Sequence, residues 1–169
     1  MIITQVVCEV TMSEFKLLTF LLDDESYGIP ITKVKEIIGM LAITKIPHAP
    51  KFLKGIINLR GSVIPVVDLR LKLGLEEIGY NDKTCILIVN INEDGAKEKP
   101  IGVIVDVVSE VLTMMSEDID NSTNWNRGAS KDTDYIQGIG KLQDKNLIIL
   151  DIEKMFSSHE LVSIAEMHA

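Results

Sequence analysis

The chain carries one pattern twice, and this duplication limits its possible folds more than any other feature of the sequence. Residues 55–69 align without a gap on residues 138–152, each running from a glycine through a turn and an apolar stretch to an aspartate. Residues 27–38 align in the same way on residues 101–112, and the order of the two segments is the same in each half. The pattern predicts a duplicated β unit, with a seam between the copies where a partner binds.

The size of the repeat favours domain duplication over a solenoid. Each unit has about 70 residues, which is longer than a solenoid repeat, and units this small gain stability by packing on one another. We expect a single domain over residues 12–156, with repeat units at about 15–74 and 84–156. Residues 157–169 start with capping-box spacing, which predicts a C-terminal helix. Residues 1–11 form an N-terminal extension to which we assign no role.

Short apolar runs separated by turn residues indicate an all-β fold. The expected strands are 15–22, 27–31, 55–59, 62–67, 84–91 and 100–105. Arg60 and Gly61 form the tight turn of one hairpin, and Pro30, which lacks an amide donor, predicts a sheet edge at its position. Two small, closed or nearly closed barrels side by side are the expected architecture.

Helical spacing is limited to a few short segments. Residues 32–38 have apolar side chains at helical intervals, with Thr32 as the N-cap, whereas the counterpart 106–112 has a more β-like pattern. Asp68 and Asp151 each end a strand and precede an apolar stretch. Because aspartate satisfies the free amides of a helix N-terminus, we expect both to cap short helices.

Charge and motifs argue against nucleic-acid binding and catalysis. The net charge is −8, the pI is about 4.9 and no basic stripe is present, so binding to nucleic acid or an anionic membrane is not expected. Phosphate-binding and nucleophile-elbow motifs are absent from the sequence. The carboxylates cluster in expected turns and caps rather than in acid–base pairs. We therefore expect neither an enzyme nor a cofactor.

Cysteine and histidine spacing does not predict a metal site. Cys8 and Cys85 lie among aliphatic residues without a CxxC pattern, which indicates buried free thiols and a reducing cytoplasm. His48 lies in a Pro-rich loop and is expected to face solvent. None of the three histidines has another histidine or a cysteine at ligand spacing.

Two charged residues stand out because their neighbours are apolar. Glu36 lies between Val34 and Ile37, and Arg60 lies in the hairpin turn. Each can be a solvated surface charge. Alternatively, the two form an ion pair that holds the expected helix 32–38 to the hairpin, since arginine can donate to a carboxylate with two N–H groups.

Three segments closely resemble the CheW family of bacterial chemotaxis coupling proteins. Residues 52–70, which include Asn58-Leu59-Arg60-Gly61, resemble the signature of that family, and residues 27–37 resemble its first hairpin. Residues 101–111 match its mid-chain motif. The motifs have the right order and spacing, and the resemblance covers Phe15 to Phe156.

The resemblance implies a fold and a function. The fold is two packed SH3-like five-stranded β-barrel subdomains, related by duplication, that form two intertwined halves of one domain. The function is that of a non-enzymatic adaptor without cofactors. The implied partners are the cytoplasmic tip of a chemoreceptor, or methyl-accepting chemotaxis protein, and the regulatory domain of the histidine kinase CheA. The receptor hairpin lies in the groove between the barrels. The implied location is the cytoplasm, with recruitment to membrane-bound receptor arrays.

The resemblance also implies candidate residues for receptor or kinase coupling. By position these are Ile31, Val34, Glu36, Gly55, Arg60, Gly102, Val108 and Val111. It supports a structural ion pair between Arg60 and Glu36. Val34 and Val108 occupy equivalent positions in the two copies, so a pseudo-twofold axis would bring both to the seam.

Other functions stay open at the level of sequence. A CheW-like module could belong to a larger coupling protein or to the kinase itself. An unrelated small-ligand-binding β domain would have a large apolar cavity inside one barrel. An enzyme would require titratable residues clustered in a cleft.

Overall fold

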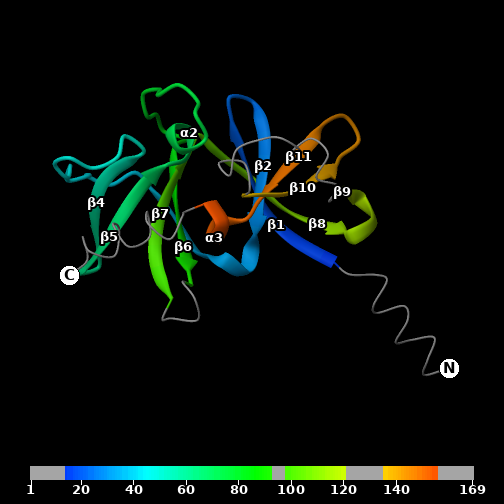
Figure 1. Ribbon diagram of the computed structural model, residues 1–169, viewed down its shortest axis with the longest axis horizontal. Helices are drawn as coiled ribbons and strands as arrows, with labels where there is room; N and C mark the ends of the chain where they lie inside the picture. The colour runs from blue at the N-terminus through cyan, green and yellow to red at the C-terminus, as the bar shows by residue number, and fades with distance from the viewer. Residues whose placement is uncertain (1–13, 93–97, 121–134, 156–169) are drawn as a thin grey trace.

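Two β-sheets contain most of the residues that this computed structural model describes, which are 14–92, 98–120 and 135–155 (Figure 1). The first sheet has the order β8-β1-β2-β11-β10-β9, and the second has the order β3-β6-β7-β5-β4. The strands of the first sheet are Val107–Met115 (β8), Glu14–Leu22 (β1), Glu25–Pro30 (β2), Asn146–Leu150 (β11), Ile136–Lys141 (β10) and Ile119–Asp120 (β9). The strands of the second sheet are Val34–Gly39 (β3), Cys85–Ile91 (β6), Lys99–Val105 (β7), Ser62–Asp68 (β5) and Leu53–Leu59 (β4). The predicted all-β fold is confirmed.

Each sheet combines strands from both copies of the repeat. The aligned segments make β2, β3, β4 and β5 the counterparts of β7, β8, β10 and β11, which leaves β1 and β6 as a pair. Replacing each strand of the first sheet, apart from the short β9, by its counterpart gives β3-β6-β7-β5-β4, the order of the second sheet. The hairpin β1–β2 therefore lies among strands of the second copy, and β6–β7 lies among strands of the first.

The equivalence of the sheets extends to their closure. The pairs β2–β11 and β5–β7 are both parallel. The chain after β3 reaches the opposite edge of its sheet, where Thr44 pairs with Ile56 of β4. In the same way β9 pairs with β10 through Asp120 and Ile139, which is the counterpart of Ile56. In each sheet, the chain from one edge strand, β3 or β8, thus continues to the opposite edge and pairs there, as barrel closure requires.

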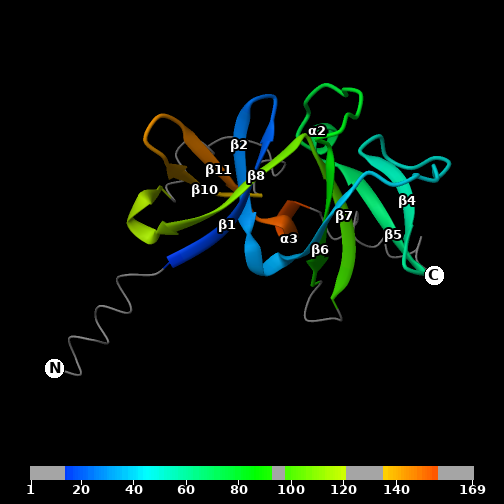
Figure 2. The same ribbon diagram turned by 180° about the vertical axis from the view of Figure 1, so that it is seen from behind.

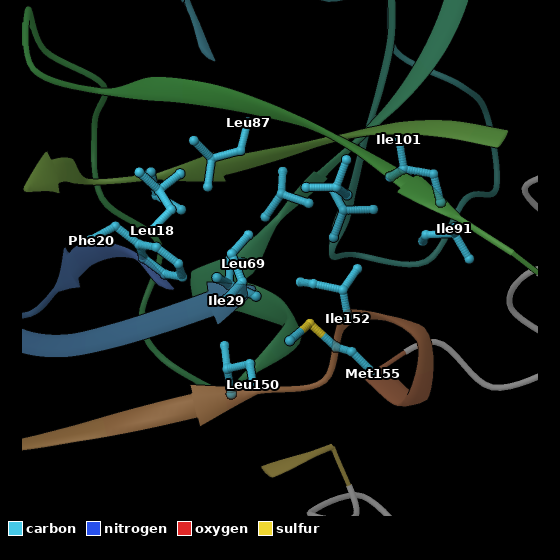
Figure 3. Close-up of a cluster of buried hydrophobic side chains, with 14 of the residues drawn as sticks. Leu18, Phe20, Ile29, Leu69, Leu87, Ile91, Ile101, Leu150, Ile152 and Met155 are labelled. Carbon is cyan, nitrogen blue, oxygen red and sulfur yellow. The ribbon is translucent and has the colours of Figure 1, made fainter. Parts of the chain in front are cut away.

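The largest apolar core lies between the two sheets (Figure 3). This central cluster contains Leu18, Phe20, Leu22, Ile29, Leu53, Val67, Leu69, Leu87, Val89, Ile91, Ile101, Val103, Val105, Leu150, Ile152 and Met155. Because successive strand residues point to opposite faces, β6 supplies Leu87 and Val89 to this cluster and Ile86 and Ile88 to a smaller core inside the second sheet. A third cluster, around Leu147, fills the first sheet.

Two four-residue helices enter the central cluster after an aspartate cap. They are α2, Leu69–Lys72, and α3, Ile152–Met155, and Figure 1 shows α3 between the two sheets. Asp68 accepts a hydrogen bond from the Arg70 amide, and Asp151 accepts from the amides of Glu153 and Lys154. The predicted caps are confirmed.

The predicted helix over residues 32–38 is wrong. Only Ile31–Lys33 form a 3-10 turn (η1), preceded by Pro30 rather than capped by Thr32, and β3 follows. A register shift between Val34 and Glu36 inserts an extra residue into the strand. This bulge places Val34 and Ile37 on one face at a spacing of three, which imitates the period of a helix. A second 3-10 turn, η2 at Ser116–Asp118, precedes β9.

Single-residue predictions have mixed outcomes. Pro30 does not lie on an edge strand, since β2 lies between β1 and β11, but the pairing with β11 ends at Gly28. His48 is exposed, as predicted, and Cys85 is free but only half-buried. No helix within the described ranges is long and apolar enough to cross a membrane. Predictions for residues 1–11, for Cys8 and for the helix 157–169 lie outside the described residues.

Candidate functional site

One wall of the seam between the sheets is β8, the edge strand of the first sheet. Val108 pairs with Phe20, and Val111 pairs with Leu18. Phe20 and Leu18 belong to the central cluster. Because cross-strand partners share a face of the sheet, Val108 and Val111 lie on the face that carries this cluster.

The other wall is β3, the edge strand of the second sheet. Val34 pairs with Val89, and Ile37 pairs with Leu87, and both partners belong to the central cluster. The alignment of residues 27–38 on 101–112 makes Val34 the counterpart of Val108 and Ile37 the counterpart of Val111. In Figure 2, β8 and the light-blue strand β3 run along the side that faces the viewer.

An apolar margin with approximate twofold symmetry lines the seam and consists of Val34, Ile37, Val108 and Val111. Val34 and Val108 are half-buried against the central cluster, and so is Ile31 at the corner before β3. Ile37 is 44% exposed and Val111 is 52% exposed. Exposed aliphatic side chains beside a buried cluster form the kind of apolar surface that a partner helix or strand covers. Sequence reasoning missed Ile37, although its equivalence to Val111 in the aligned copies was a usable signal.

Gly55 and Gly102 shape the structure rather than face the seam. Both are buried. Gly55 has φ +146°, and a Cβ built on it lies 2.1 Å from the carbonyl oxygen of Thr44. A Cβ on Gly102 lies 2.9 Å from Cγ2 of Ile86. Each glycine therefore permits a close approach inside the second sheet, which a side chain would block.

Arg60 and Glu36 form the predicted ion pair. Arg60 and Gly61 have φ values of 50° and 86°, as expected for a type I′ hairpin turn, and the Gly61 amide donates to Oδ1 of Asn58 at 3.0 Å. The hydrogen bond and the charge of Glu36 raise the pKa of the Arg60 guanidinium. Because Glu36 belongs to β3, the pair ties the β4–β5 hairpin to a strand, not to a helix. It thus links the two opposite edges of the second sheet.

We expect Arg60→Ala to lower the melting temperature only slightly, because the Arg60 side chain is 68% exposed and exposed ion pairs contribute little. Alanine keeps the Cβ, so the strain of the positive φ is unchanged. Thermal unfolding by circular dichroism measures the effect, with Glu36→Ala as the matched removal of the other partner. A large loss of stability in either variant would contradict this expectation.

Sequence reasoning missed a buried polar cluster around Arg70. The Arg70 side chain is 4% exposed, and its Nη2 and Nη1 lie 2.7 Å from Asp23 Oδ1 and Asp106 Oδ2 respectively. Its Nε donates to the carbonyl oxygen of Glu76 at 2.8 Å. Burial alone would lower the pKa of the Arg70 guanidinium, but the hydrogen bonds and charges of the two aspartates raise it. The two aspartates lie far from Arg70 in the sequence, so no local pattern predicted the cluster.

Asp68 extends this cluster toward the segment that joins the two repeats. Besides capping α2, it accepts a hydrogen bond from the Tyr80 hydroxyl at 3.0 Å. Burial, followed by the charge of Asp68, raises the pKa of Tyr80. Among the described residues, no group of three histidine, cysteine or acidic side chains could hold a metal ion. These ionised groups are paired with one another, as structural networks are.

Comparisons with known proteins agree on one family. The model of the CheW-like domain matches residues 16–160. A chemotaxis protein CheW from Klebsiella aerogenes is 36% identical over 154 residues, covering 89% of each chain. One from Treponema pallidum is 35% identical over 156 residues, covering 91% of this chain and 89% of its own. The crystal structure of the scaffolding protein TtCheW from Thermoanaerobacter tengcongensis has a TM-score of 0.74 and 36% identity, covering 88% of this chain and 96% of its own.

Proposed function

The chain belongs to the CheW-like domain family and is a coupling adaptor of chemotaxis, and we propose that it joins chemoreceptor tips to the histidine kinase CheA. It acts without catalysing a reaction, through surfaces that bind two proteins at once. Its place is the cytoplasm, at the membrane-bound receptor arrays. We also propose that 12–156 is one CheW-like domain, in line with the extent of the family match.

The observation that carries the receptor proposal is the apolar margin of the seam. Val34, Ile37, Val108 and Val111 lie on the two sheet faces that meet at the central cluster, and two of them are well exposed. An apolar stripe on a helix of the receptor hairpin would fit a groove between two aliphatic walls. The proposed receptor contacts are these four residues and Ile31. Gly55 and Gly102 act by shaping the second sheet.

The kinase contact is proposed for the β4–β5 hairpin. Arg60 lies at its tip, and its counterpart in the second copy is Gln143, so only one of the two hairpins carries this charge. Arg60 and Glu36 also border a groove of about 210 Å³, lined in addition by Leu59, Ile64 and Pro100. An asymmetric hairpin lets a partner distinguish two otherwise equivalent barrels.

A small-ligand-binding function has less support. Ile57, Ile64 and Val66 fill the inside of the second sheet together with three further aliphatic residues. Leu17, Met114 and Leu147, with Ile149, fill the inside of the first. A ligand-binding barrel would need open space there. A CheW-like module of a longer coupling protein would use the same seam, so binding experiments with the receptor fragment apply to it as well.

Co-sedimentation tests the adaptor function directly. The full chain is mixed with a receptor signalling fragment, with the isolated CheA regulatory domain, and with both. We expect binding to each and a ternary complex with both together, because the seam and the β4–β5 hairpin are separate surfaces. If the chain binds neither protein, the proposed function is wrong.

We expect Val108→Met to weaken receptor binding about tenfold, which corresponds to about 1.4 kcal/mol. The longer side chain adds volume where the half-buried valine lines the seam. Val63→Met is the matched control, since Val63 is an exposed valine on β5, outside the two walls. Isothermal titration with the receptor fragment measures both variants. Equal affinities for Val108→Met and the native chain would remove Val108 from the contact.

A further inference from the structure

The chain passes between the two sheets at two equivalent corners. Asp106 alone separates β7 of the second sheet from β8 of the first. The turn η1, Ile31–Lys33, separates β2 of the first sheet from β3 of the second. The alignment of residues 27–38 on 101–112 makes these corners counterparts. Each corner leads directly into one wall of the seam.

An ion pair ties each corner to a short helix. Arg70 of α2 pairs with Asp106, and Glu153 of α3 pairs with Lys33. Arg70 and Glu153 are themselves counterparts, each the second residue of a helix that follows a capping aspartate. The two pairs therefore lie at equivalent corners of the two halves, although their corner residues stand one position apart in the alignment. They have opposite polarity, with the cation on the helix in one pair and on the corner in the other.

The two pairs differ in their exposure to solvent. The side chains of Arg70 and Asp106 are 4% and 19% exposed, whereas those of Lys33 and Glu153 are 37% and 34% exposed. Salt screens exposed charges more strongly than buried ones. The pair at the β7–β8 corner is therefore the firmer of the two, and the pair at the β2–β3 corner is the one that solvent and salt can loosen.

We propose that these ion pairs are clamps that set the distance between the walls of the seam, which makes Arg70, Asp106, Lys33 and Glu153 positioning residues for partner binding. Lys33 immediately precedes Val34, and Asp106 stands two residues before Val108. The wall strands β3 and β8 are edge strands, each paired with only one strand among the described residues. The clamp thus supplies the second attachment at the start of each wall. This inference rests on the proposed function, because it concerns the seam that binds the receptor.

Charge reversal of the exposed clamp tests the proposal without disturbing the core. Lys33→Glu and Glu153→Lys each place two like charges together, and we expect each to weaken binding of the receptor fragment about fivefold. The double variant restores an ion pair of opposite polarity and returns the affinity to within about twofold of native. Asp106→Asn, which keeps the side-chain shape in the buried clamp, weakens binding about tenfold. Titration calorimetry measures each variant, alongside its melting temperature.

Lys35→Glu separates positioning from the change in net charge. Lys35 is an exposed lysine on the same wall, two residues beyond Lys33, and has no part in the clamp. We expect its reversal to leave the affinity within about twofold of native. Equal losses for Lys33→Glu and Lys35→Glu, or a double variant as weak as the singles, would overturn the proposal. A native chain that does not bind the receptor fragment would instead overturn the proposed function.

Discussion

Gly55→Ala is expected to lower the free energy of unfolding by about 3–5 kcal/mol, since it adds backbone strain to a steric overlap. The backbone of Gly55 has φ +146°, a region that residues with a side chain rarely adopt, and the added Cβ would lie 2.1 Å from the Thr44 carbonyl oxygen. Thr44 cannot move away freely, because its amide and carbonyl both bond to Ile56 at 2.9 Å. Urea unfolding followed by circular dichroism measures the change.

Two other glycines provide controls of graded severity. A Cβ on Gly102 has its two closest neighbours in the side chains of Ile86 and Val66, at 2.9 Å and 3.2 Å, so Gly102→Ala should cost about 1–3 kcal/mol. A Cβ on Gly39 meets nothing within 4 Å and needs no unusual φ. Gly39→Ala should therefore be neutral or slightly stabilising. If Gly55→Ala were no more harmful than Gly39→Ala, the bridge between Thr44 and Ile56 would not be part of the folded core.

The repeat predicted the local structure well because its signals act over short distances. A glycine, a two-residue turn and an aspartate cap each fix the backbone within a few residues. The hairpin at Arg60 and the caps at Asp68 and Asp151 could therefore be predicted. The family resemblance implied intertwined halves, but the sequence did not show which hairpins the copies exchange. The exchange depends on pairings such as β1 with β8, which join residues far apart in the sequence. The seam consequently lies between two sheets that each contain both copies.

Registers, rather than residue types, decide which side chains reach the seam. Val34 and Val108 were predicted there from the alignment of the copies. Ile37 was overlooked because the bulge before Glu36 gave its segment the appearance of a helix. With the strand in place, the pairing of Ile37 with Leu87 assigns it to the same face as Val34. Because of this one-residue bulge, the site predicted from the sequence lacked Ile37.

The two arginines at Arg60 and Arg70 show the limits of reading charges from sequence. Arg60 was assigned its partner, Glu36, because both lie among apolar residues and the family resemblance supports the pair. No partner was predicted for Arg70 from the sequence. Arg70 is buried against Asp23 and Asp106, which lie far from it in the sequence, and it also donates to the carbonyl oxygen of Glu76, six residues further along the chain. Tertiary contacts of this kind leave no periodic signal.

Arg70→Ala is expected to lower the free energy of unfolding by about 3 kcal/mol, the usual loss when one partner of a buried ion pair is removed. Among the described residues, Asp106 then keeps a bond from the Asp23 amide at 3.2 Å, and the Glu76 carbonyl loses its bond from Nε of Arg70. Arg60→Ala is the control, because it removes the same side-chain type from an exposed ion pair. Urea unfolding compares the two.

Comparing the stability of the two variants also tests whether the Arg70 cluster helps to hold the two sheets together. Asp23 lies in the turn between β1 and β2 of the first sheet, and Asp106 lies at the junction between β7 and β8. The helix α2, by contrast, follows β5 of the second sheet. Loss of Arg70 therefore removes one polar attachment between sheets that also meet through the apolar central cluster and the ion pair of Lys33 and Glu153. Because the central cluster is unchanged, the variant should remain folded at moderate temperature. It should lose receptor affinity, because the corner that leads into β8 has lost its ion pair. A stability loss for Arg70→Ala no larger than that for Arg60→Ala would show that the Arg70 cluster contributes little to holding the sheets together.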